Sequence, residues 1–109
     1  MVDAPLIESI ARHRGVDTQL LKLAEEASEV AQAAIKHKMN PTDATLAKLG
    51  EELADFGIIH DQLLYLIEPL GTHEGLYRQF KVGRELVRIE TESDRNIGGK
   101  ITDFYKEEK

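Results

Sequence analysis

The chain has 109 residues, 41% of them hydrophobic, which suits one soluble domain with its own core. Its formal net charge of −6 argues against a binder of duplex nucleic acid, and the absence of cysteine excludes disulfides, zinc–thiolate sites and thiol nucleophiles. No secretory leader and no membrane-spanning run is evident, so we expect a cytoplasmic protein without a membrane partner.

The apolar pattern predicts helices throughout, because no long stretch alternates with period two. We expect a short first helix over 5–14, ended by Gly15. The second helix is expected to start at Asp17 or Thr18 as its N-cap and to end near Lys38.

An apolar stripe with three- or four-residue spacing follows the second helix, which predicts its core-facing side. The stripe consists of Leu20, Leu23, Ala27, Val30 and Ala34. Several of its members are alanine, so another helix backbone can approach closely.

The third helix is expected from Thr42 or Asp43 to about Ile67, before Pro69. It is apolar on two sides, so it should be buried on two sides, the second against another subunit. One stripe consists of Leu46, Leu49, Leu53, Phe56, His60, Leu64 and Ile67, and the other of Ile59, Leu63 and Leu66.

Two glycines, Gly50 and Gly57, lie inside this third helix. Each costs about 1 kcal/mol relative to alanine in a helix interior. Close approach of a neighbouring helix or a ligand would explain them, and so would a local bend.

A second break is expected at 68–72, followed by a fourth helix over 73–92 and a peripheral tail over 93–109. One edge of the fourth helix is basic, at Lys81, Arg84 and Arg88. The whole pattern predicts a single all-α domain over 1–109. It would be a bundle of about four helices with a long antiparallel central hairpin, assembled as a homodimer or homotetramer.

Acidic clusters in the second and third helices each place two carboxylates three residues apart, Glu26 with Glu29 and Glu52 with Asp55. Residues at this spacing are neighbours on a helix surface, and like charges held close in an apolar setting repel. Oxygen-only ligands suit a hard cation such as Mg²⁺ or Mn²⁺. The clusters therefore predict a divalent-cation site, with a metal-free acidic interaction module as the alternative.

Other carboxylate sites fit the chain poorly. A ferritin-like di-iron site needs Glu-x-x-His, which the sequence lacks. A calcium-binding EF-hand needs an Asp-rich loop, whereas these clusters lie in helical patterns. No Gly-rich phosphate loop or Ser/His/Asp arrangement is present.

The segments 22–30 and 49–56 resemble the MazG-like all-α nucleoside triphosphate pyrophosphohydrolases. The signature of that family is Glu-x-x-Glu on one helix and Glu-x-x-Asp on the next, and the resemblance covers about 16–66. It implies that four residues hold Mg²⁺, with Mn²⁺ as a substitute, and act in catalysis: Glu26, Glu29, Glu52 and Asp55.

The resemblance also implies the reaction, hydrolysis of a canonical or modified nucleoside triphosphate to monophosphate and pyrophosphate. Related branches act on phosphoribosyl-ATP or dUTP, and a non-catalytic nucleotide-binding regulatory dimer is a further alternative. The candidates for substrate contact are Gln19, Lys22, Lys81, Arg84 and Arg88. The base, the sugar, the number of metal ions, the phosphorus attacked and the general base stay open.

Overall fold

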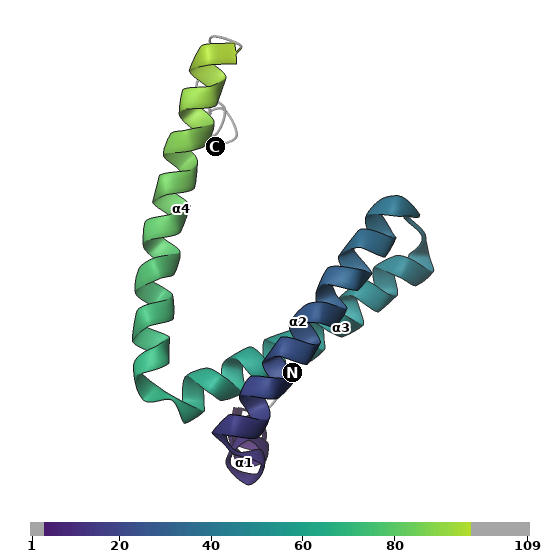
Figure 1. The fold of residues 1–109 in the computed structure, drawn as a ribbon, viewed down its shortest axis with the longest axis vertical. Helices are drawn as coiled ribbons and strands as arrows, with labels where there is room; N and C mark the ends of the chain where they lie inside the picture. Colours follow the sequence, from purple (N-terminus) through teal and green to yellow (C-terminus); the bar gives the residue numbers. More distant parts are fainter. Residues whose placement is uncertain (1–3, 97–109) are drawn as a thin grey trace. The chain divides into compact units, whose positions relative to one another are not determined.

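A computed structural model describes residues 4–96 of the chain. These residues form four helices and no strand, so the all-α prediction is confirmed (Figure 1). The helices are α1 (Ala4–Arg14), α2 (Val16–Met39), α3 (Asp43–Leu66) and α4 (Glu68–Asn96). None of them combines the length and the apolarity needed to cross a membrane. The chain divides into two compact units, Met1–Gly71 and Thr72–Lys109, and the motif region over 16–66 lies wholly in the first.

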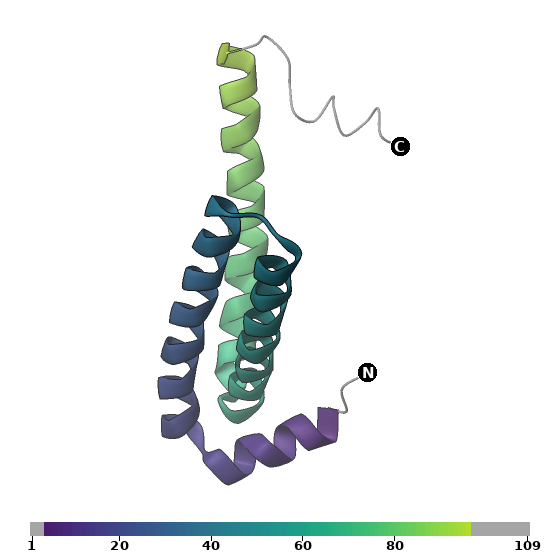
Figure 2. The ribbon, with the colours of Figure 1, turned by 90° about the vertical axis from the view of Figure 1, so that its right-hand side faces the viewer.

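The centre of the first unit is the antiparallel hairpin of α2 and α3, which lie side by side over 24 residues each (Figure 2). A short connection joins them and ends in a capping box at the start of α3. The Thr42 hydroxyl accepts from the backbone N–H of Thr45, and the Thr45 hydroxyl accepts from the backbone N–H of Thr42. The predicted hairpin and its start at Thr42 are therefore confirmed.

A single glycine joins α1 to α2. Gly15 has a φ of 86°, a left-handed conformation that glycine adopts without steric cost. Its N–H donates to the carbonyl of Ala11, and its own carbonyl accepts from Gln19, so it closes one helix and opens the next. The predicted N-cap at Asp17 was wrong, because Asp17 already lies in the first turn of α2.

The predicted break at 68–72 was also wrong, because α4 begins at Glu68 and only Ile67 is non-helical between α3 and α4. Pro69 lies in the first turn of α4, where a backbone N–H has no intrahelical partner, so a proline costs nothing there. The helix ends at Asn96, beyond the expected 92. The expected tail lies outside the described residues from 97 onward.

The side of α2 that packs on α3 differs from the predicted stripe. Its buried residues are Gln19, Glu26 and Ala33. The predicted stripe lies about a quarter turn away at 100° per residue, and its Leu20 is 43% exposed. The prediction was wrong because it assumed that the most apolar side of α2 faces α3, whereas α2 turns a partly polar edge toward its neighbour.

On α3 the shorter of the two predicted stripes is the buried one, with Ile59 and Leu63 in the core. The longer stripe is covered only in part: its Leu46 and Leu53 are 55% and 50% exposed, and its other members are half-buried. Burial of this second side against another subunit stays a prediction.

Buried glutamines tie the first three helices together. The Gln19 side chain donates to Gln62 Oε1 at 2.6 Å, and Gln62 donates to the carbonyl of Ile7 at 3.2 Å. Gln19 and Gln62 are only 4% and 1% exposed. Buried polar groups need such partners, so this chain of hydrogen bonds fixes α1 and α2 on α3.

We expect Gln62→Ala to lower the free energy of unfolding by about 1–3 kcal/mol, because it leaves the buried Gln19 amide without a partner. The matched control is Gln32→Ala, whose exposed amide donates to Ser28 in the preceding turn, and it should change stability by no more than about 0.5 kcal/mol. Urea unfolding at a fixed protein concentration measures both. Equal effects of the two substitutions would contradict a structural role for the glutamine pair.

Candidate metal centre

The acidic residues lie in two copies of one local pattern. On α2 the order Lys-x-x-Glu-Glu-x-x-Glu begins at Lys22, and on α3 the order Lys-x-x-Glu-Glu-x-x-Asp begins at Lys48. In each copy the lysine pairs with the second glutamate one turn later. Lys22 Nζ lies 3.7 Å from Glu26 Oε1, and Lys48 Nζ lies 2.9 Å from Glu52 Oε1. The antiparallel hairpin sets the two copies opposite each other, so the site has a local two-fold character.

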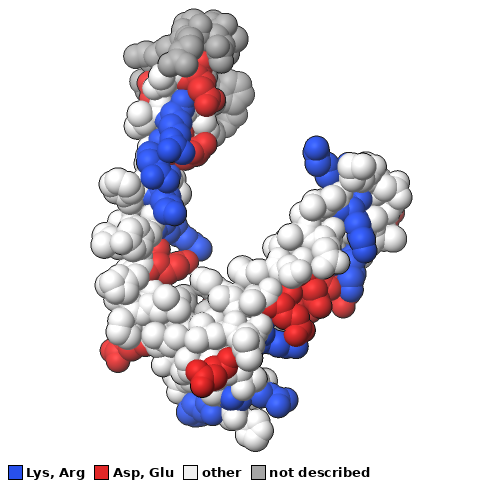
Figure 3. Space-filling view, in the orientation of Figure 1, with Lys and Arg blue, Asp and Glu red and all other residues white. Residues whose placement is uncertain are grey.

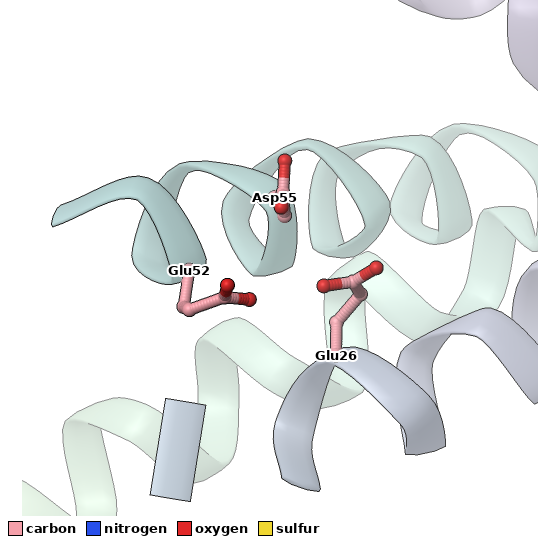
Figure 4. Close-up of side chains that lie close together, drawn as sticks. All are labelled: Glu26, Glu52 and Asp55. Carbon is pink, nitrogen blue, oxygen red and sulfur yellow. The ribbon is translucent and has the colours of Figure 1, made fainter. Parts of the chain in front are cut away.

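Three carboxylates meet between the helices. Glu26 from α2 and Glu52 and Asp55 from α3 each offer an oxygen, and these oxygens all lie within 4.8 Å of one another. The carboxylates of Glu26 and Glu52 point toward each other (Figure 4). Glu26 and Glu52 are buried, and Asp55 is exposed. The hairpin thus brings together carboxylates from two helices that are about 26 residues apart in the sequence.

Each buried glutamate has one oxygen without a partner. Glu26 Oε2 and Glu52 Oε2 are inaccessible to solvent and make no hydrogen bond to any described residue. The other oxygen of each faces its lysine. A buried carboxylate oxygen without a partner is costly, and a cation between the two oxygens would remove that cost. The donor set, all carboxylate oxygen, fits a hard divalent cation.

Glu29 interacts electrostatically with Glu26 and Glu52, although it does not belong to the group of carboxylates whose oxygens lie within 4.8 Å of one another. A hydrogen bond with Glu52 and the negative charge of Glu26 raise the pKa of Glu29 to about 7. The adjacent Lys48 ammonium, followed by the hydrogen bond with Glu29, lowers the pKa of Glu52. Of this pair, Glu29 is therefore the more readily protonated carboxylate. All four predicted carboxylates interact.

A cavity of about 400 Å³ opens beside the carboxylates, a volume typical of small-molecule sites. Acidic side chains gather on this side of the hairpin (Figure 3). The cavity is lined in part by three of the predicted carboxylates and by two lysines: Glu29, Glu52, Asp55, Lys36 and Lys48. The cavity thus combines cation ligands with positive charge suited to an anionic ligand.

Neither lysine of the cavity, Lys36 or Lys48, was predicted as a site residue from the sequence. The signal for Lys48 was present, because it stands four residues before Glu52 just as Lys22 stands four before Glu26. Lys36 lies seven residues after Glu29, two turns along the same side of α2. Spacing from the carboxylates would have found both.

The predicted substrate contacts are placed differently. Gln19 is buried and bonded to Gln62, and Lys22 pairs with Glu25 at 3.3 Å and with Glu26. Neither lines the cavity. The three remaining candidates are exposed residues of α4, in the second unit: Lys81, Arg84 and Arg88.

No family model, curated protein or solved structure matches the chain. The case for a function therefore depends on the geometry of the hairpin and on the resemblance of the acidic motif.

We expect the cation-free protein to lose stability as the pH rises from 4.5 through 7. The folded state binds the Glu29 proton more tightly than the unfolded chain, whose pKa is near 4.5, so this contribution is complete below pH 4.5 and lost above pH 7. Thermal melting in EDTA across this range measures it. Glu29→Gln should remove this part of the pH dependence, and Glu25→Gln should keep it. An unchanged profile in Glu29→Gln would contradict the assignment.

Proposed function

We propose that this protein hydrolyses a nucleoside triphosphate to a monophosphate and pyrophosphate with a divalent cation at the acidic centre. The observation that carries the proposal is the pair of buried, unpartnered oxygens, Glu26 Oε2 and Glu52 Oε2, on two carboxylates that point toward each other across the hairpin. The resemblance of the two acidic segments to MazG-like enzymes supplies the reaction and the substrate class.

The residues that would hold the cation are Glu26, Glu29, Glu52 and Asp55. When bound, Mg²⁺ neutralises phosphate charge and lowers the pKa of a coordinated water. A set of four carboxylates leaves a net negative site even beside Lys22 and Lys48, so the cation has a strong electrostatic reason to bind.

The cavity residues would bind the polyphosphate and handle the proton. Lys36 and Lys48 place positive charge beside the carboxylates, where phosphate oxygens can accept from both ammonium groups. The attacking water must lose a proton, and Glu29 and Glu52 are the carboxylates of the cavity that adjoin each other. We assign one of these two as the general base.

We expect release of pyrophosphate from one or a few members of a panel of canonical and modified NTPs and dNTPs, in the presence of Mg²⁺ and not in EDTA. Glu52→Gln should abolish release with helix content unchanged, because it removes a charged ligand at the centre. Glu25→Gln is the matched control, since Glu25 is exposed and pairs with Lys22. Full activity of Glu52→Gln would contradict the site. Silence of the unmodified protein across the panel and on phosphoribosyl-ATP would contradict the reaction.

We expect Mg²⁺ alone to stabilise the protein by about 2.7 kcal/mol at a hundred times its dissociation constant, because it binds the folded state only. Thermal melting with and without Mg²⁺ tests this independently of any substrate. Glu26→Gln should lose the shift and its neighbour control Glu25→Gln should keep it. The absence of a shift in the unmodified protein would favour the metal-free interaction module.

A further inference from the structure

The cavity beside the acidic centre extends in one direction along the hairpin. On α2 its lining continues from Glu29 through Gln32 to Lys36, and on α3 it continues from Glu52 back to Lys48. Both runs lead toward the connection between α2 and α3, because the two helices are antiparallel. The cavity therefore has an acidic end, where the proposed cation binds, and a second end that carries two lysines.

The opposite direction along the hairpin is closed by the buried glutamines. The two copies of the acidic pattern begin at positions 22 and 48, so Lys36 corresponds to Gln62 on α3. Gln62 is 1% exposed, accepts from Gln19 and donates to the carbonyl of Ile7 on α1. A ligand at the acidic centre thus meets open, cationic space toward the connection and packed, uncharged side chains toward α1.

Lys36 differs from the other two lysines of the hairpin site in its partners. Lys22 and Lys48 form ion pairs with glutamates of their own copy of the pattern. Lys36 is exposed, lines the cavity and forms no ion pair with any carboxylate of residues 4–96. Side chains on a helix lean toward its N-terminus, so the Lys36 side chain leaves the helix in the direction of Glu29. An uncompensated cation next to a cation-binding centre favours an anion that extends beyond that centre.

We propose that Lys36 binds the terminal phosphate of the substrate and makes the site selective for nucleoside triphosphates over diphosphates. The inference rests on the proposed hydrolysis and adds the direction in which the substrate lies. The bond that breaks is at the acidic centre, and the β- and γ-phosphates lie along the cavity toward the connection. The nucleoside is at the acidic end, away from both lysines.

The spacing of the charged groups fits a chain of phosphates. Glu29 and Lys36 are seven residues apart, which is about 10 Å along α2 at a rise of 1.5 Å per residue. Lys48 is held nearer to the centre, because its ammonium lies 2.9 Å from Glu52 Oε1. Lys48 therefore contacts a phosphate beside the cation, whereas Lys36 contacts only a ligand whose anionic chain continues past it.

The order of the phosphates follows from the reaction. Water adds across the anhydride bond between the α- and β-phosphates, so the attacked phosphorus gains a hydroxyl and the bridging oxygen leaves with the other phosphate. The general base takes the proton. The β- and γ-phosphates leave together as pyrophosphate, which carries more negative charge than the monophosphate. The lysine end of the cavity matches this product, because ammonium groups donate to phosphate oxygens.

Binding of the two products tests the direction without turnover. In calorimetry with Mg²⁺, we expect Lys36→Gln to weaken the binding of inorganic pyrophosphate by about tenfold or more, because a charge-assisted hydrogen bond is lost. Binding of AMP, GMP, CMP and UMP should stay as in the unmodified protein. Lys36→Arg keeps the charge and should retain pyrophosphate binding. The matched control is Lys38→Gln, since Lys38 is exposed and does not line the cavity.

Two results of this experiment would overturn the proposal. One is an unmodified protein that does not bind pyrophosphate in the presence of Mg²⁺. The other is a Lys36→Gln variant that binds pyrophosphate normally, whether or not its binding of the monophosphates is weakened. Weaker binding of the monophosphates alone would mean that the substrate lies in the opposite direction.

Kinetics test the selectivity. For the triphosphate that the protein hydrolyses, we expect Lys36→Gln to lower the ratio of its kcat/KM to that of the corresponding diphosphate by about tenfold or more, and Lys38→Gln to leave the ratio unchanged. An equal loss on both substrates would contradict a role for Lys36 at the terminal phosphate. Failure of the proposed reaction is a separate result, because it is the absence of pyrophosphate release by the unmodified protein, whereas product binding requires no turnover.

Discussion

The opposition of Glu26 and Glu52 between α2 and α3 is the constraint on which the rest of the structure depends. The contact side of a helix hairpin is where apolar side chains usually gather. Here it carries two buried carboxylates, each with one oxygen held by a lysine and one oxygen without a partner. Two like charges in such a place oppose folding. The hairpin therefore needs compensation from other contacts.

Part of that compensation is visible in the first unit. The Gln19–Gln62 pair joins the two long helices near one end, and the His37–Thr45 contact joins them near the other. Ile59 and Leu63 supply the apolar contact between. The carboxylates thus sit in the middle of a frame fixed at both ends, which keeps them close despite their repulsion. A preorganised site of this kind would bind the proposed cation without the cost of assembling its ligands.

The sequence predicted the hairpin well, because its helices and its cap depend on local spacing, whereas the metal-binding and catalytic roles of the four carboxylates stay predictions. The capping residue Thr42 and the three-residue spacing of Glu52 and Asp55 are local features. The rotation of α2 about its own axis was not predictable from its apolar pattern, because that pattern reports where apolar residues lie and not which neighbour covers them. The same limit hid the buried state of Gln19, whose partner is 43 residues away. The predicted break at 68–72 was wrong for a different reason: a proline such as Pro69 is found either after the end of one helix or in the first turn of the next.

The displaced apolar stripe and the buried acidic pair are two consequences of one rotation. If α2 had turned Leu20 and Ala27 toward α3, Glu26 would lie at the edge of the hairpin, where its carboxylate would be solvated. Because Glu26 faces inward instead, the alanine stripe is left open on the far side, and the monomer gives up the burial that would have stabilised it.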